Sequence, residues 1–237
     1  MKRAQSRLVV ALAFVLAFGA CASEPTRVQR PENLPENINA PMLADGPVAP
    51  WVARWEGESR EVFKYRHRIV AALGLRQGDR VADIGCGTGP FESILSKAVG
   101  PLGWVYALDI APKFVAHVKK RVEKEGLKNV EVRQSQQNDV GLPTASIDLA
   151  FICDVYHHFE DPPVILASIR RALKPHGRLA IVEFDRIEGK SSPFILKHVR
   201  AGKDVFRAEI EAAGFRFLRE VPVDGLTDNY LLVFSRD

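Results

Sequence analysis

The sequence of 237 residues has few cysteines, few methionines and no Arg/Lys run interleaved with aromatic residues. Its three cysteines, Cys21, Cys86 and Cys153, are too few for a disulfide framework, and none has the CxxC or Cys/His spacing typical of structural zinc. Charges of both signs are mixed along the chain, so the net charge of +4 indicates a solvated surface, and a nucleic-acid partner is the minor alternative. A hydrophobic share of 46% and a charged share of 26% are typical of one globular domain with a real core.

Residues 1–21 differ in kind from the rest of the chain. Positive residues precede an apolar run, Leu8 to Phe18, which is short for a bilayer span. The run ends in Gly19-Ala20-Cys21 and resembles a bacterial secretory signal with a lipoprotein box. We therefore expect an exported protein, periplasmic or membrane-anchored through a lipidated Cys21. An uncleaved anchor, or a cytoplasmic protein that starts at Met42, is the alternative.

Residues 22–54 are rich in proline, which fixes φ and removes hydrogen-bond donors, and they are predicted to form an extended tether. Residues 55–237 alternate short apolar runs with amphipathic stretches. This alternation predicts a single α/β domain of the Rossmann-like, doubly wound class, with helices on both faces of a mostly parallel sheet. The expected strands are Arg80–Ile84, Trp104–Leu108, Val130–Arg133, Ile147–Cys153, Arg178–Phe184, Phe215–Val221 and Tyr230–Phe234, and the expected helices are Trp55–Leu73, Phe91–Ala98, Pro112–Glu125, Pro162–Leu173 and Lys203–Ala213.

The most specific motif is Val81-Ala82-Asp83-Ile84-Gly85-Cys86-Gly87-Thr88-Gly89, a strand that enters a glycine turn. Glycines let a ligand approach the backbone closely. A Walker loop would need a Lys-Ser/Thr pair after the last glycine, and a dinucleotide fingerprint would need a glycine where Pro90 stands. Asp83 also repels a pyrophosphate but suits a ligand with an ammonium and a sulfonium, which favours S-adenosylmethionine. A tight turn without a ligand is the alternative.

Asp109 follows the second expected strand. An acid at this place, somewhat over 20 residues past a glycine loop, can accept hydrogen bonds from both ribose hydroxyls. By itself it would be read as a surface carboxylate or a helix cap, and the glycine turn is what favours the ribose role.

From about Trp55 onward the sequence resembles class I S-adenosylmethionine-dependent methyltransferases, particularly the small-molecule enzymes of the ubiquinone-biosynthesis type. The resemblance implies a seven-stranded sheet with the last strand antiparallel, and a lid formed by Trp55 to Leu73. It implies that the glycine turn receives the methionine part of the cofactor, that Asp109 binds ribose and that Ile110 packs on adenine. Asn138 or the adjacent Asp139 would meet the adenine amino group. The implied cofactor site thus consists of Asp83, Gly85, Cys86, Gly87, Gly89, Asp109, Ile110, Asn138 and Asp139.

The residues after the fourth strand are the candidates for handling the methyl acceptor. Methyl transfer from a sulfonium is an in-line displacement, so alignment matters most and a base is needed only for a protonated acceptor. His157 is the first choice as acceptor-orienting group or base, followed by Tyr156 and Asp154. His158 is expected to point away, because Phe159 turns inward. Phe194, His198 and Phe206 form either an acceptor wall or core.

No metal is expected, because the Asp-Asn pair that metal-dependent relatives carry after strand five is missing; a cation held by Asp154, Glu183 and Asp185 is the alternative. The predicted function is methyl transfer to a small-molecule acceptor. A binding module without turnover and an NAD-dependent oxidoreductase are the rival functions. The sequence leaves the acceptor and the oligomeric state open.

Overall fold

The structure is a computed structural model that describes residues 30–237. The expected signal-like segment and Cys21 lie outside the described residues. Within residues 30–237, no helix combines the length and the apolar character needed to cross a bilayer.

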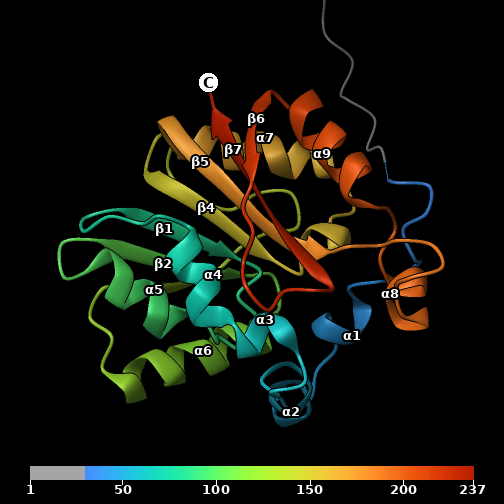
Figure 1. The fold of residues 1–237 in the computed structure, drawn as a ribbon. Helices are drawn as coiled ribbons and strands as arrows, with labels where there is room; N and C mark the ends of the chain where they lie inside the picture. Colours follow the sequence, from blue (N-terminus) through green and yellow to red (C-terminus); the bar gives the residue numbers. More distant parts are fainter. Residues whose placement is uncertain (1–29) are drawn as a thin grey trace, which may run out of the picture.

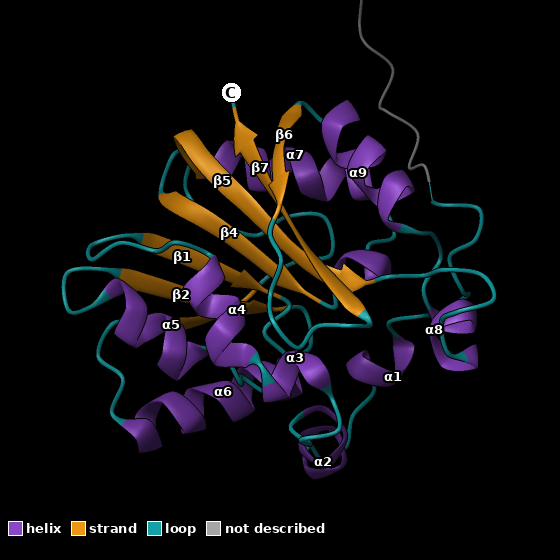
Figure 2. Ribbon diagram, viewed as in Figure 1, coloured by secondary structure: helices purple, strands orange, loops and turns teal. Residues whose placement is uncertain are grey.

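The described chain is built around one seven-stranded sheet with the strand order β3-β2-β1-β4-β5-β7-β6 (Figures 1 and 2). Neighbouring strands from β3 to β5 pair in parallel, and β7 runs antiparallel to both β5 and β6. This confirms the predicted α/β class with an antiparallel last strand. The strands are β1 Arg80–Ile84, β2 Trp104–Asp109, β3 Val130–Gln134, β4 Ile147–Cys153, β5 Leu173–Phe184, β6 Phe215–Glu220 and β7 Asn229–Arg236.

Helices cover both faces of this sheet. Alternate residues of the central strands point to opposite sides, so that Ala82 and Ile84 join one buried apolar cluster and Val81 joins the other. The first cluster lies under α7 and α9, and the second under α4, α5 and α6 (Figure 1). The helical elements of this domain are α3 Glu61–Lys64, α4 Arg66–Ala72, α5 Glu92–Val99, α6 Pro112–Glu125, the 3-10 turn η1 Tyr156–His158, α7 Pro162–Ala172, α8 Pro193–His198 and α9 Lys203–Ala212.

The predicted tether is wrong for residues 30–54, which fold onto the domain. Leu34 and Ile38 are buried, and two helices follow, α1 Ala40–Leu43 and α2 Ala49–Trp55. Proline stands in the first turn of both helices, where its missing N–H costs nothing. The prolines that suggested an extended chain therefore begin helices, and the residues described before Trp55 belong to the folded unit.

The expected helix from Trp55 to Leu73 is divided. The residue Trp55 ends α2, and α3 and α4 follow as separate short helices that meet at Tyr65. The chain between Trp55 and Phe63 thereby crosses the carboxyl edge of the sheet.

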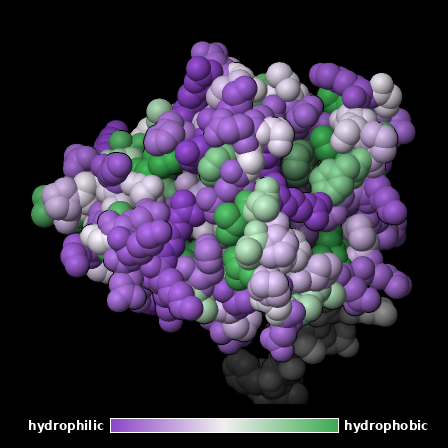
Figure 3. Space-filling model, turned by 90° about the horizontal axis from the view of Figure 1, so that it is seen from below, coloured by the Kyte–Doolittle hydropathy of each residue, from purple (hydrophilic) through white to green (hydrophobic). Residues whose placement is uncertain are grey.

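The surface seen from below in Figure 3 is mainly hydrophilic, and its hydrophobic residues form small separate patches. The large exposed apolar side chains of the described residues come from different elements and loops: Leu43, Leu102, Ile187, Phe194 and Val205. The chemistry of the domain therefore has to be sought in its pockets.

The packing of α7 on the sheet predicts a large effect of truncation at Leu166, which is fully buried. Leu166→Ala should lower the free energy of unfolding by about 2–5 kcal/mol, because lost burial and a residual cavity add up. The same change at Leu102, which is 88% exposed, should alter it by less than about 0.5 kcal/mol. Urea denaturation of both variants checks this, and similar midpoints would contradict the described packing.

Candidate active site

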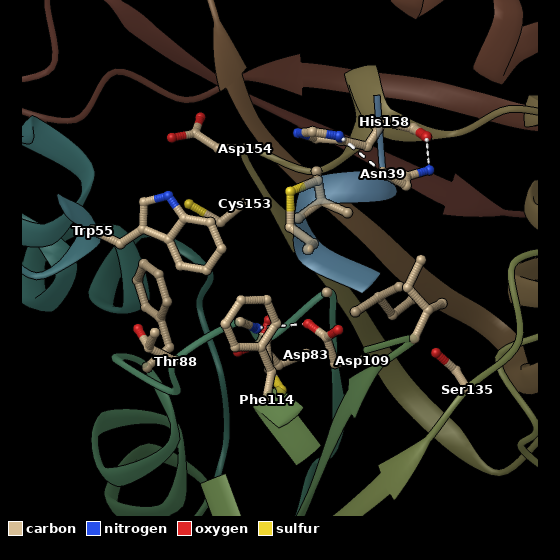
Figure 4. Close-up of a pocket in the computed structure, with 18 of the residues that line it drawn as sticks. Asn39, Trp55, Asp83, Thr88, Asp109, Phe114, Ser135, Cys153, Asp154 and His158 are labelled. Atoms are coloured by element: carbon tan, nitrogen blue, oxygen red, sulfur yellow. Dashed lines mark hydrogen bonds between the residues drawn. The ribbon is translucent and has the colours of Figure 1, made fainter. Parts of the chain in front are cut away.

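A pocket opens where the carboxyl ends of β1 to β4 meet. In doubly wound sheets ligands bind at this edge, at the point where the strand order reverses, which here lies between β1 and β4. Figure 4 shows Asp109 and Ser135 on one side of the pocket, and Asp154 and His158 on the opposite side. Backbone of the glycine turn forms the floor between them.

The glycine turn is shaped by close approaches that a side chain would prevent. A Cβ at Gly85 would lie 2.6 Å from the Val155 side chain, and one at Gly87 would lie 3.2 Å from the Trp55 ring. Gly87 also has φ of +55°, a left-handed conformation that favours glycine. Gly85, Cys86 and Gly87 line the pocket as predicted from the sequence. Gly89 does not; a Cβ there would meet Glu92 and Val118, so it serves the packing of α6.

Asp109 ties the glycine turn to the end of β2. Its Oδ2 accepts a hydrogen bond from Gly87 N at 2.9 Å, and its Oδ1 accepts one from Ala111 N at 2.8 Å. Burial raises the pKa of Asp109, while these N–H donors act in the opposite direction. Each carboxylate oxygen keeps a further lone pair, and both Asp109 and Ile110 line the pocket. The position suits a ribose diol.

Two further buried acids lie under the pocket. Asp83 lines it, and the Asp83 Oδ2 has no hydrogen-bond partner among residues 30–237. Burial, together with the charge of Glu92, raises the pKa of Asp83 well above its ordinary value, and burial raises the pKa of Glu92 to about 7. Unpaired buried acids of this kind attract a cationic ligand and repel a phosphate. They fit the ammonium and sulfonium of S-adenosylmethionine. Glu92 was missed by the sequence analysis, although it stands in the first turn of the helix after the glycine turn.

The structure places Asn138 and Asp139, the predicted adenine contacts, apart from this pocket. Asn138 is exposed and outside the lining, and the Asp139 Oδ1 accepts hydrogen bonds from Gly141 N and from the Ser168 hydroxyl. An isolated bridge between Gln136 and Asp139 closes the turn and directs the Asp139 carboxylate toward α7. The pocket is lined instead by the residues that directly follow β3, which are Ser135, Gln136 and Gln137. Their position directly after a strand is the sequence feature from which their place in the pocket could have been predicted.

Aromatic residues close the pocket from above. The rings of Trp55 and Phe114 are 5.2 Å apart between centroids, and Met42 of α1 lies beside them in the lining. Lys113 fastens this cover to α6, since its Nζ donates to the carbonyl oxygens of Pro41 and Ala44 at 3.1 and 2.8 Å. The cover thus comes in part from the segment predicted to be a tether, through Asn39 and Met42, and in part from Trp55, Arg60, Val62 and Phe63 of the predicted lid.

Asp154 stands at the end of β4 with φ of +53°. Its Oδ2 forms an ion pair with Arg60 at 2.7 Å, and its Oδ1 accepts from the Asn229 amide at 2.6 Å. Burial raises the pKa of Asp154, and the nearby Arg60 lowers it.

A second pocket adjoins the first at this edge. The two share Met42, Trp55, Arg60, Asp154 and His158 in their linings. The far wall of the second pocket contains three further aromatic residues and two further histidines, namely Trp51, Phe184, Phe194, His157 and His198.

The two adjacent histidines take different places. His157 lies in the wall of the second pocket, and its Nδ1 is 2.9 Å from both carboxylate oxygens of Glu183. Burial lowers the pKa of His157 to about 3. His158 lines both pockets, and its Nδ1 is 3.1 Å from the Asn39 Oδ1 (Figure 4). The expectation that His158 points away from the site is therefore wrong.

Tyr156 is wrongly predicted as a site residue. It is fully buried, packs edge-on against Phe159 and Phe206, and donates its hydroxyl to Glu209 at 2.9 Å. It lines neither pocket and instead holds α9 to the sheet. Of the proposed acceptor-wall residues, Phe194 and His198 line the second pocket, whereas Phe206 belongs to the core.

Comparison with known proteins agrees with this geometry. Residues 82–181 match the family described as "Methyltransferase domain". A crystal structure of an S-adenosylmethionine-dependent methyltransferase from Aquifex aeolicus superposes with a TM-score of 0.70 and 29% identity, over 81% of this chain and all of that chain. The chain carries an S-adenosylmethionine-dependent methyltransferase domain.

Curated relatives of this methyltransferase domain include enzymes named for quinone biosynthesis. The demethylmenaquinone methyltransferase of Geobacillus kaustophilus is 28% identical over 52% of this chain and 53% of its own length. The ubiquinone/menaquinone biosynthesis C-methyltransferase of Teredinibacter turnerae is 34% identical over 48% of this chain and 46% of its own. The chain thus spans about half the length of these relatives.

Two backbone N–H groups donate hydrogen bonds that orient the Asp109 carboxylate, and this orientation predicts a role for Asp109 in cofactor binding. Asp109→Ala should weaken binding of S-adenosylhomocysteine by about 1–3 kcal/mol, because buried ribose hydroxyls lose their acceptor. Asn138→Ala, at an exposed position outside both pockets, should leave the affinity unchanged. Calorimetry measures both. Equal affinities for the two variants would contradict the placement of the ribose at Asp109.

The approach of Trp55 to Gly87 predicts a second effect on cofactor binding. Gly87→Ala and Gly126→Ala both place a side chain at positive φ, +55° and +65°, and each should cost about 1–2 kcal/mol in stability. Only the Cβ at Gly87 meets the pocket; at Gly126 nothing lies within 4 Å. Thermal denaturation should therefore show a similar decrease in melting temperature for both variants. Calorimetry should show weakened S-adenosylhomocysteine binding for Gly87→Ala alone. Undiminished binding by Gly87→Ala would disprove the close approach.

Proposed function

We propose that this protein transfers the methyl group of S-adenosylmethionine to a small aromatic acceptor that carries an ionisable hydroxyl group and binds in the second pocket. The observation that carries this proposal is the shared wall of the two pockets. An acceptor in the second pocket would lie next to a cofactor in the first, and adjacency is what an in-line displacement requires. The names of the quinone-biosynthesis relatives support an acceptor of this kind.

The walls of the second pocket favour a flat, partly polar molecule. Trp51, Phe184 and Phe194 offer ring surfaces for stacking. Arg54 and Arg60 line the same pocket and stabilise a negatively charged oxygen on the acceptor. S-adenosylmethionine supplies a methyl group on a sulfonium, and its transfer leaves S-adenosylhomocysteine.

The residues of the chain do the positioning. Asp154 holds Arg60 at the border of the pockets, and Trp55 and Met42 exclude water from above the cofactor. His157 lines the second pocket with its Nδ1 fixed by Glu183 and its Nε2 without a hydrogen-bond partner among residues 30–237, so it orients the acceptor.

Turnover with a labelled methyl donor tests this function. The full chain, incubated with S-adenosylmethionine labelled in the methyl group and a set of reduced naphthoquinols and phenols, should transfer label to at least one of them. His157→Ala should lower that rate about a hundred- to ten-thousandfold, which is the range for a histidine acting on a reacting group. Its affinity for S-adenosylhomocysteine should stay the same, since His157 does not line the cofactor pocket.

Two outcomes would count against the proposal. Binding of S-adenosylhomocysteine without transfer to any aromatic hydroxyl compound would refute this acceptor class. Equal losses of turnover, cofactor affinity and thermal stability in His157→Ala would mean that His157 is only structural.

A further inference from the structure

Three histidines meet at one wall of the second pocket. His157 and His158 come from η1, and His198 comes from the end of α8. Each offers a ring nitrogen, and these nitrogens all lie within 4.8 Å of one another. The ring centroids are 4.3 Å apart for His157 and His158, and 4.9 and 5.2 Å apart for the two pairs that include His198.

The protonation of His157 is set by its carboxylate neighbour. The buried Glu183 accepts the hydrogen bond from His157 Nδ1, so Nδ1 carries the proton and Nε2 carries a lone pair. This Nε2 is buried and has no hydrogen-bond partner among residues 30–237. In metal sites, a histidine ligand commonly donates its second ring N–H to a carboxylate, and this hydrogen bond orients the first ring nitrogen toward the metal.

The tautomer of His158 is fixed by Asn39. The Asn39 amide nitrogen donates to the His158 carbonyl oxygen and to Glu160, each at 3.1 Å, so the amide oxygen of Asn39 is left as an acceptor for His158 Nδ1. The lone pair of His158 is then on Nε2 as well. Two neighbouring side chains thus present acceptor nitrogens without protons.

Hydrogen bonding leaves an unprotonated Nε2 on both His157 and His158, because Glu183 and Asn39 face their Nδ1 atoms. The charged groups that face the cluster are the acids Glu183 and Asp154 and the arginines Arg54, Arg60 and Arg200. Arg60 is paired with Asp154 at 2.7 Å, and Arg200 is paired with Glu209 at 2.6 Å.

We propose that His157, His158 and His198 form a binding site for a divalent transition metal ion of the Zn²⁺ type. Three imidazoles suit zinc, whereas Mg²⁺ and Ca²⁺ prefer oxygen ligands. Nitrogens on one tetrahedral zinc lie about 3.4 Å apart, as follows from bond lengths of about 2.0–2.1 Å. The three ring nitrogens, which lie within 4.8 Å of one another, therefore move closer together when the metal binds. His198 makes this movement, because it is half-buried and stands at the end of a six-residue helix.

A metal in this place would keep a coordination position open to the second pocket, because all three histidines line it. An acceptor hydroxyl bound there would be more acidic than in water; this consequence rests on the proposed function, whereas metal binding does not. His157 Nε2 cannot hold a metal and a proton at once, so His157 would orient the acceptor as a metal ligand and not act as a base.

Titration of the metal-free protein with Co²⁺, an optical stand-in for Zn²⁺, tests the site. The full chain, treated with a chelator and dialysed, should bind one equivalent with the visible absorption of a four-coordinate ion, and Zn²⁺ should displace it. His198→Ala should weaken binding more than about tenfold, and the buried histidines stay in place in this variant. His67→Ala, at an exposed histidine outside both pockets, is the control and should bind as the unchanged protein does.

Glu183→Gln probes the positioning of His157. It should weaken Co²⁺ binding about ten- to a hundredfold while the absorption keeps its shape, because the ligands stay and only their support changes. No stoichiometric binding by the unchanged protein, or equal affinity for His198→Ala, would overturn the proposal. Calorimetry with S-adenosylhomocysteine on the same samples shows separately whether the cofactor site works.

Discussion

The carboxylate of Asp109 joins the two backbone segments on which the site depends. It accepts one hydrogen bond from Gly87 N, in the turn after β1, and one from Ala111 N, in the segment after β2. These bonds fix the glycine turn against the end of the neighbouring strand. Without this link the turn would lose the anchor that holds Gly87 under the Trp55 ring. The same oxygens face the pocket, and the group that stabilises the turn is therefore also the group that a ribose would meet.

Charge explains why this edge suits one class of ligand. Asp83, Glu92 and Asp109 are all buried around the glycine turn, and burial raises the pKa of each. Taking acids out of water is costly unless a cation or hydrogen-bond donors compensate. N–H donors compensate Asp109, whereas Asp83 keeps an oxygen without a partner among the described residues. A ligand with an ammonium and a sulfonium supplies the missing compensation, which a dinucleotide would not.

The sheet could be predicted from the sequence because its signals are local. Continuous apolar runs such as Ile147–Cys153, and a helix that begins at Pro112 and ends before Gly126, match the structure at both ends. The cover of the site could not be predicted in this way. Asn39 reaches His158 across 119 positions of sequence, and no local pattern encodes such a contact. The prolines before residue 54 suggested an extended chain, but buried Leu34 and Ile38 outweigh that preference.

The directions of the side chains could not be predicted from the sequence either, because they depend on contacts with distant elements. The sequence places Asp139, Tyr156 and His158 near the correct edge, yet their contacts depend on α7, α9 and Asn39, respectively. His198 gains its place only because α8 folds back beside η1. Residues at strand ends were thus found from the sequence, whereas residues supplied by separate elements required the structure.

The central claim is that the carboxyl edge of β1 to β4 binds the cofactor, with the acceptor site beside it. A crystal structure of the full chain with S-adenosylhomocysteine tests this most directly. We predict ribose hydroxyls on the Asp109 carboxylate, the amino acid part at the glycine turn near Asp83, and the sulfur facing the border of the two pockets near Asp154. A ligand bound elsewhere, or bound with its sulfur turned away from the second pocket, would contradict the account.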